Sequence, residues 1–291
     1  MGATGATGGA LLTRLIDLGV PCRALSRHPD RLRTDISRTP DVEIHYADAA
    51  DSDSLRAVFD GATQLFLTMP NSPDQVALET RVIEAAADRG IEHIVKLSAP
   101  TAAPDSPVAI ARWHCEIEQV LRASGIAHTV LRPYAFMQKL ALLGREVATR
   151  GAIVGTMGSA ACNYIDCRDI ADVAAAALTR PDIAGGTYTL TGSRTFGYPE
   201  LAVLLSELLN TPIEYIDLPP TAFREYLIER SHLPHWLADH LTEIQRLAVE
   251  HPERPTDTVA RILGRPPRTL ESFLTENLGA FRQSTAATEQ R

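Results

Sequence analysis

The stretch G-A-T-G-A-T-G-G at residues 2–9 leads almost directly into L-L-T-R-L-I-D-L-G at residues 11–19. Gly2, Gly5 and Gly8 recur every three residues, and the leucines after them recur at helical spacing. A glycine loop that opens a helix presents backbone N–H groups to negative charge. The stretch therefore predicts a phosphate-binding loop; a flexible N-terminal segment is the alternative.

Apolar strands and amphipathic helices alternate after this loop. Strands are expected at 22–27, 42–48, 64–70, 93–99 and 127–133, and helices at 52–61, 74–89 and 108–124. Such alternation predicts parallel strands joined by right-handed crossovers. The expected fold class is therefore α/β, with a doubly wound parallel sheet of the dinucleotide-binding type.

The alternation loosens beyond Pro133. Further helices are expected at 167–181, 198–210, 220–231 and 234–251 and within 257–278, and strands at 187–192 and 213–220. We expect a nucleotide-binding core over 1–150 and a smaller, mostly helical substrate-side region over 151–282 that is interleaved with the core. The polar tail at 283–291 is expected to be disordered.

The start of the chain conflicts with this pattern. A strand of about five residues should precede the glycine loop, but only Met1 does. In the usual strand order this first strand is central, so its loss would leave backbone groups of both neighbours unpaired. We expect the chain to be an N-terminally shortened version of a longer reading frame.

Composition narrows the class of ligand. A formal net charge of −8, without a basic stripe, argues against direct binding of nucleic acid. The four cysteines form no C-x-x-C pair, and His232 and His235 lack ligand-spaced partners, so no metal is expected. No apolar segment is long enough to span a membrane, and no basic leader opens the chain. We expect a cytoplasmic protein that binds a small-molecule substrate.

The charged residues Asp166, Arg168 and Asp169 are interpreted as structural rather than catalytic. They stand at the start of an expected helix, where the carboxylates can cap the helix and the guanidinium can bridge them.

Six motifs occur in an order that resembles a known family. They are GATGATG (2–8), ALSR (24–27), VKLSA (95–99), RWHCEIEQVLRASGIAHTVLRPYAFMQ (112–138), YIDCRDIADVAAAAL (164–178) and YTLTG (188–192). Together they resemble the NmrA-like branch of the atypical short-chain dehydrogenases over about residues 2–280. The resemblance implies a Rossmann domain that binds NAD(P)(H) and a C-terminal substrate cleft. Members include quinone, dye and phenylpropanoid reductases, and redox-sensing regulators without known turnover.

The resemblance also exposes a missing proton donor. Ordinary short-chain dehydrogenases use a Tyr-x-x-x-Lys pair, and alignment places Ile110 and His114 at these two positions. His114 is the expected substitute, because an imidazole with a near-neutral pKa can donate a proton and hydrogen-bond a ribose hydroxyl. Glu118, one helical turn on, is expected to orient it. Packing of His114 beside Trp113 is the alternative.

Two further catalytic candidates follow strands. Ser98 resembles the family's active-site serine, with Lys96 on the same face of the strand, and its hydroxyl is expected to bind a substrate carbonyl. Tyr134 is a second candidate proton donor. Strand termination by Ser98 and core packing by Tyr134 are the alternatives.

The resemblance implies a set of cofactor-binding residues along the chain. The loop residues Gly2, Thr4, Gly5, Ala6, Thr7 and Gly8 are expected at the pyrophosphate. Asp48 is expected near the adenine. The segments around the nicotinamide and its ribose are expected to include Thr68, Met69, Pro70, Ser98, His114, Pro133 and Phe136.

The end of the second expected strand bears on the choice of coenzyme. An acidic residue there would accept from the ribose 2′-hydroxyl of NAD, but this chain has Ser26 followed by Arg27. Arg27, helped by Arg31, is expected to bind a 2′-phosphate, which predicts NADP(H) over NAD(H). Solvated surface charges are the alternative.

These features favour an NADPH-dependent reductase of a conjugated acceptor such as a quinone, an enone or a dye. Such acceptors delocalise the developing charge and need less help from a proton donor. The alternative is a non-catalytic sensor that binds NADP(H) and reports to a protein partner.

Overall fold

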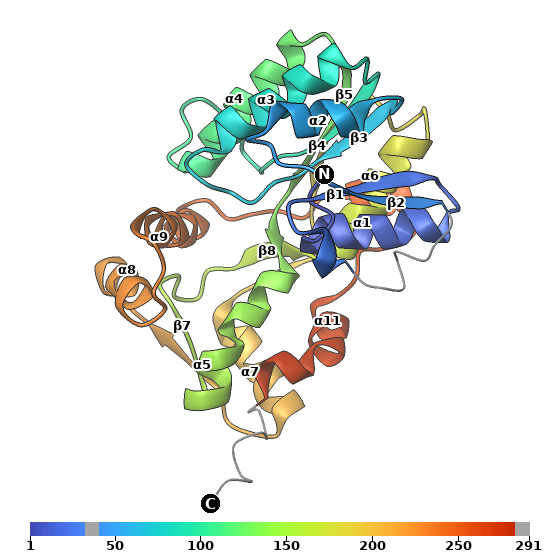
Figure 1. Ribbon diagram of the computed structural model, residues 1–291. Helices are drawn as coiled ribbons and strands as arrows, with labels where there is room; N and C mark the ends of the chain where they lie inside the picture. The colour runs from blue at the N-terminus through green and yellow to red at the C-terminus, as the bar shows by residue number, and fades with distance from the viewer. Residues whose placement is uncertain (33–40, 283–291) are drawn as a thin grey trace, which may run out of the picture. The chain divides into compact units, whose positions relative to one another are not determined.

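The computed structural model describes residues 1–32 and 41–282, and these fall into two interleaved units (Figure 1). Unit 1 comprises Met1–Tyr134, Cys167–Leu190 and Asp257–Pro266, and unit 2 comprises the segments between and after these. The division differs from the expected boundary at residue 150, because the chain returns to unit 1 twice after Tyr134. The tail predicted at 283–291 lies outside the described residues.

Unit 1 is built on parallel strands, as the alternating pattern predicts. Strand β1 (Cys22–Ser26) pairs in parallel with β2 (Val42–Tyr46). A four-stranded parallel sheet has the order β3 (Gln64–Leu67), β4 (His93–Leu97), β5 (Ala127–Pro133) and β9 (Thr187–Leu190).

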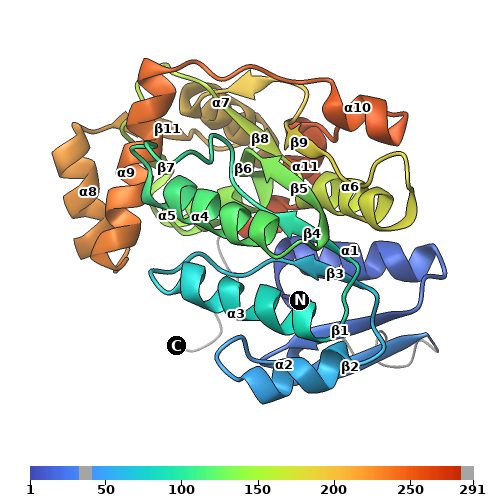
Figure 2. The ribbon, with the colours of Figure 1, turned by 90° about the horizontal axis from the view of Figure 1, so that it is seen from above.

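Helices cover both faces of these strands (Figures 1 and 2). On one side lie α2 (Ser52–Phe59), α3 (Gln75–Asp88) and α4 (Ala109–Ala123), whose apolar faces pack on β3 and β4 through the fully buried Leu55, Ile83 and Ile117. On the other side lie α1 (Ala6–Asp17) and α6 (Cys167–Thr179), which pack against each other, and α10 (Thr258–Leu263) packs on α6. This layering confirms the doubly wound α/β prediction.

Residues 1–3 link the two sheets at the place expected for the first strand. The Met1 nitrogen donates to the Phe66 carbonyl at 2.6 Å, while the N–H groups of Gly2 and Ala3 donate to the Leu25 carbonyl at 3.1 and 3.2 Å. This short segment therefore lies between β1 and β3. Among the described residues, no regular strand precedes α1.

Unit 2 combines helices with two small sheets. One sheet has the order β10 (Thr195–Phe196), β8 (Cys162–Ile165) and β6 (Ala135–Phe136), and β11 (Glu214–Asp217) pairs in parallel with β7 (Ala152–Gly155). The helices are α5 (Gly144–Arg150), α7 (Tyr198–Leu209), α8 (Pro220–Glu229), α9 (His235–Glu250) and α11 (Leu270–Glu276). Short 3-10 helices lie at Met137–Leu143 and Leu278–Phe281, and α8 packs beside α9 (Figure 2).

The charged residues Asp166, Arg168 and Asp169 lie at the start of α6, and two of them have partners that the sequence did not suggest. Asp169 is fully buried, and its Oδ1 lies 2.8 Å from Nη1 of Arg265, which follows α10. Asp166 accepts a hydrogen bond from the Gln138 amide at 2.8 Å. The salt bridge of Asp169 ties the first turn of α6 to the segment after α10, whereas capping of the helix and bridging by Arg168 stay predictions.

The described helices include none that is both long and apolar enough to cross a membrane.

Candidate active and cofactor site

The residues singled out by the sequence follow successive parallel strands. Because the carboxyl ends of parallel strands meet at one edge of a sheet, this is where open α/β sheets bind ligands. The end of β1 is followed by Arg27, β2 by Asp48, β3 by Thr68, β4 by Ser98 and β5 by Tyr134.

Two glycines of the loop are required by the backbone itself. Gly2 has a φ of +81°, and a Cβ there would lie 2.6 Å from the Thr68 carbonyl oxygen. A Cβ on Gly8 would lie 2.1 Å from the Gly2 carbonyl oxygen. The glycines thus let the loop fold tightly on itself and against the end of β3.

Gly5 is different, because packing within the protein demands a glycine there much less strictly. Its φ is −83°, and a Cβ would meet only the Gly2 carbonyl oxygen, at 3.3 Å. Gly5 is the N-cap of α1, no side chain caps this helix, and Thr4, Gly5 and Ala6 are exposed. The N–H groups in the first turn of α1 have no partner within the helix, and Gly5 beside them carries no side chain. Together, residues 4–7 form a cradle that fits a pyrophosphate. Thr7 has a buried side chain, so in this cradle it would contribute its backbone N–H.

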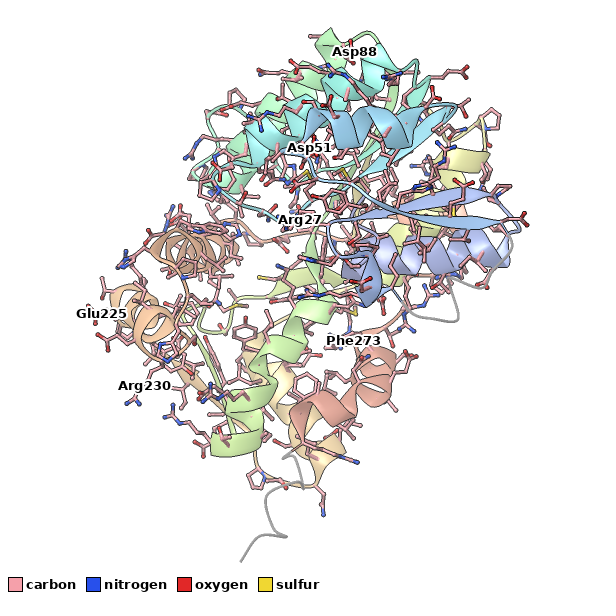
Figure 3. The ribbon with its side chains drawn as sticks, viewed as in Figure 1. Arg27, Asp51, Asp88, Glu225, Arg230 and Phe273 are labelled. Carbon is pink, nitrogen blue, oxygen red and sulfur yellow. The ribbon has the colours of Figure 1, made fainter. Side chains whose placement is uncertain are left out.

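The end of β1 is joined to this loop. Ser26 is buried, its Oγ lies 3.3 Å from the Thr4 hydroxyl, and it accepts a hydrogen bond from the His28 N–H at 3.0 Å. Arg27 is exposed at the exit of β1 (Figure 3). Asp48 is half-buried, and its carboxylate accepts from the Ala50 N–H at 2.9 Å, which shapes the turn before α2.

The segment after β3 lies next to the loop through Thr68, whose carbonyl faces Gly2. Met69 is half-buried against the core, and Pro70 is exposed. Pro133 is buried at the end of β5, and Tyr134, half-buried, donates its N–H to the Leu190 carbonyl at 3.0 Å.

Ser98 is held by a carboxylate rather than standing free. Its Oγ donates to Oε1 of Glu118 at 2.6 Å, and Arg132 donates to both oxygens of Glu118 at 3.0 and 2.6 Å. The prediction that Glu118 orients His114 is therefore wrong, because the carboxylate is engaged by strands β4 and β5. With its single proton used, Ser98 presents lone pairs, so it can accept a hydrogen bond but not donate one to a carbonyl.

His114 lies in a second buried polar group. Its Nδ1 is 3.3 Å from Nζ of Lys96, which in turn lies 2.8 Å from Oε2 of Glu79. Burial, together with the charge of Lys96, lowers the pKa of His114 well below 6.5. The imidazole is therefore neutral at neutral pH, and the expected near-neutral pKa is wrong. His114 can act as a hydrogen-bond donor but holds no imidazolium proton there.

Three residues of the site were not singled out from the sequence. Gln75 and Glu79 come from α3, and Arg132 comes from β5. A glutamate within the apolar pattern of α3, opposite a lysine inside an apolar strand, was the available signal. Within the described residues, no group of histidine, cysteine and carboxylate side chains could hold a metal ion.

Comparison with known proteins gives consistent relatives. The model of the NmrA-like family matches residues 1–274. An NAD(P)H azoreductase from Xenophilus azovorans is 32% identical over 282 residues, which cover 97% of this chain and 98% of that protein. Quinone oxidoreductase 2 from Escherichia coli (strain K12) is 26% identical over 274 residues, covering 92% and 94%.

Solved structures share the fold. The NADPH-dependent quinone oxidoreductase from Escherichia coli, complexed with NADPH, superposes with a TM-score of 0.85 at 24% identity, over 95% of this chain and 98% of that chain. The triphenylmethane reductase from Citrobacter sp., complexed with NADP(H), gives a TM-score of 0.83 at 23% identity, over 94% and 98%.

Proposed function

The chain belongs to the NmrA-like family, and on this premise we propose that it is an NAD(P)H-dependent oxidoreductase that reduces a conjugated acceptor such as a quinone, an enone or a dye. The observation that carries the proposal is the geometry of the loop at residues 2–8. Its middle glycine, Gly5, is exposed and leaves space for a ligand beside the first turn of α1. The azoreductase relative, matched over nearly its whole length, supports this class of acceptor.

The residues of unit 1 have separate tasks in this proposal. The first-turn N–H groups of α1 bind the pyrophosphate, and the exposed Arg27 binds the adenosine end. Glu118, clamped by Arg132, holds Ser98 as a hydrogen-bond acceptor at the sheet edge. A reduced nicotinamide coenzyme held by these residues would supply the hydride.

The coenzyme preference proposed is NADP(H). Arg27 has the guanidinium geometry that matches a phosphate, and Ser26 beside it places no negative charge at the end of β1. An acidic residue, which would favour the free 2′-hydroxyl of NAD(H), is absent from this position.

The neutral state of His114 supports the choice of a conjugated acceptor. A neutral imidazole can donate a hydrogen bond to a developing oxyanion but is a weak acid. A quinone or an enone spreads the charge that hydride addition creates, so hydrogen-bond donation suffices. An isolated ketone would require a full proton at the same moment.

The test is oxidation of NADPH, followed by its absorbance, with a panel of quinones, enones and dyes. We expect turnover with at least one acceptor, and a loss of roughly 100-fold in kcat for His114→Ala. His235→Ala, an exposed histidine in unit 2, is the matched control and should leave turnover unchanged. Tight NADPH binding without oxidation by any acceptor would contradict the proposal and favour the sensor.

A further inference from the structure

A chain of buried polar side chains links α3, β4 and α4 in unit 1. The Gln75 amide donates to Oε1 of Glu79 at 2.8 Å, Oε2 of Glu79 lies 2.8 Å from Nζ of Lys96, and Nζ lies 3.3 Å from Nδ1 of His114. Gln75 is 1% exposed, Glu79 and Lys96 are 0% exposed, and His114 is 5% exposed. Two charges removed from water in this way are costly to bury, and apolar residues of similar size would avoid that cost.

The direction of each hydrogen bond in this chain follows from the donors available. An ammonium has three donors and no acceptor. Lys96 donates to the Leu97 carbonyl, its Nζ lies within hydrogen-bonding distance of Nδ1 of His114, and it forms an ion pair with Oε2 of Glu79, an oxygen that accepts no hydrogen bond within the described residues. Nδ1 of His114 must therefore accept, which places the single proton of the neutral imidazole on Nε2.

We propose that Gln75, Glu79 and Lys96 are positioning residues that lock His114 as the Nε2–H tautomer. The Nε2–H is then a permanent hydrogen-bond donor, and His114 cannot act as an acceptor at that atom. In the reaction this donor would serve the ribose or the developing oxyanion, a consequence that rests on the proposed function. The assignment of the tautomer itself does not.

The test is nitrogen NMR of the full-length, coenzyme-free protein with ¹⁵N-labelled histidine. The chain has nine histidines, so the signals of His114 are identified by their loss in His114→Asn. In the wild type we expect a protonated Nε2 and an unprotonated Nδ1 throughout about pH 6–9. A protonated Nδ1 in the wild type would overturn the proposal.

The variant that probes the positioning role is the double substitution Glu79→Gln, Lys96→Met. It removes both charges together, so it avoids the stranded charge that can prevent folding of either single variant. His114 loses the donor to Nδ1, and we expect a mixture of tautomers. Glu84→Gln, on the exposed face of α3, is the control and should keep the wild-type tautomer. An unchanged Nε2–H tautomer in the double variant would also overturn the proposal.

The kinetic readout separates the two proposals. If the wild type oxidises NADPH, the double variant should lose kcat more than it changes KM for NADPH, because the chain acts through His114. If the wild type shows the expected tautomer but reduces no acceptor, the proposed function fails and the positioning of His114 stands.

Discussion

Arg27 is the single residue on which coenzyme preference depends most directly. It is exposed at the end of β1, where a guanidinium can meet a 2′-phosphate. We expect Arg27→Ala to weaken NADPH binding roughly 10-fold, or about 1.4 kcal/mol, and to leave NADH binding nearly unchanged. Isothermal titration calorimetry with both coenzymes measures this. Arg81→Ala on the exposed face of α3 is the matched control. Equal losses for both coenzymes, or wild-type NADH binding tighter than NADPH binding, would contradict the prediction.

The contacts of single side chains could be predicted from the sequence only where the two residues lie close together in the chain. Helical spacing correctly puts Glu118 one turn from His114, but it cannot show that Ser98 and Arg132 arrive from neighbouring strands and engage the carboxylate. The pKa of His114 was misjudged for the same reason, because burial and a lysine from β4 are tertiary features. Strand alternation did place Lys96 and Ser98 on one face, and each of them contacts a residue of α4.

At the scale of elements, glycine has two different uses in the loop that leads into α1. Gly8 lets the backbone pack tightly, whereas Gly5 leaves space for a ligand. In Gly8→Ala the new Cβ would lie 2.1 Å from backbone oxygen, so the loop must shift; we expect a loss of about 1–3 kcal/mol in the free energy of unfolding and loss of coenzyme binding. In Gly5→Ala the contact is 3.3 Å, so the Gly2 carbonyl oxygen has to move by only a few tenths of an ångström, and we expect the fold to tolerate the substitution.

The decisive comparison is therefore between these two alanine variants. Gly5→Ala should keep the wild-type melting temperature within a few degrees while its Kd for NADPH rises roughly 10-fold or more, because the methyl group fills the cradle. Thermal unfolding and calorimetric titration of the same samples provide both quantities. Unchanged NADPH affinity in a folded Gly5→Ala protein would show that the loop does not hold the phosphates.

Elements in unit 1 were predicted better than those in unit 2, for a physical reason. Each strand of the buried parallel sheet is an apolar run between helices of 8 to 15 residues, and such runs carry a strong signal. Strands β6, β7, β8 and β10 have two to four residues each and were not predicted. Pairing with distant strands, not local pattern, makes them strands. The segment 257–278, expected to be helical, forms α10 and α11 on either side of Gly264 and Pro266.

At the scale of the whole molecule, two kinds of buried ionisable group change the stability of the fold with pH in opposite directions. Burial raises the pKa of Glu253 from 4.5 to about 7, so the folded state binds a proton that the unfolded state releases, and stability falls as pH rises between these values. Burial, with the charge of Lys139, lowers the pKa of His240 from 6.5 to about 4, so stability rises as pH rises between those values. His114 acts in the same direction as His240.

Substitution of Glu253 removes the contribution that lowers stability as pH rises, so the opposite contribution of the buried histidines should become visible. The amide of Glu253→Gln resembles the protonated acid and can still accept the hydrogen bond from the Asn163 N–H. At about pH 5 the variant should match the wild type, and at about pH 8 it should be more stable by roughly 1–3 kcal/mol, because no charge has to be buried. Urea unfolding at the two pH values measures the difference. His240→Asn should change the slope in the opposite sense, with stability lost less steeply toward acid pH. If Glu253→Gln and wild type keep parallel pH profiles, the carboxyl group titrates alike in the folded and unfolded states, and the buried environment assigned to it is wrong.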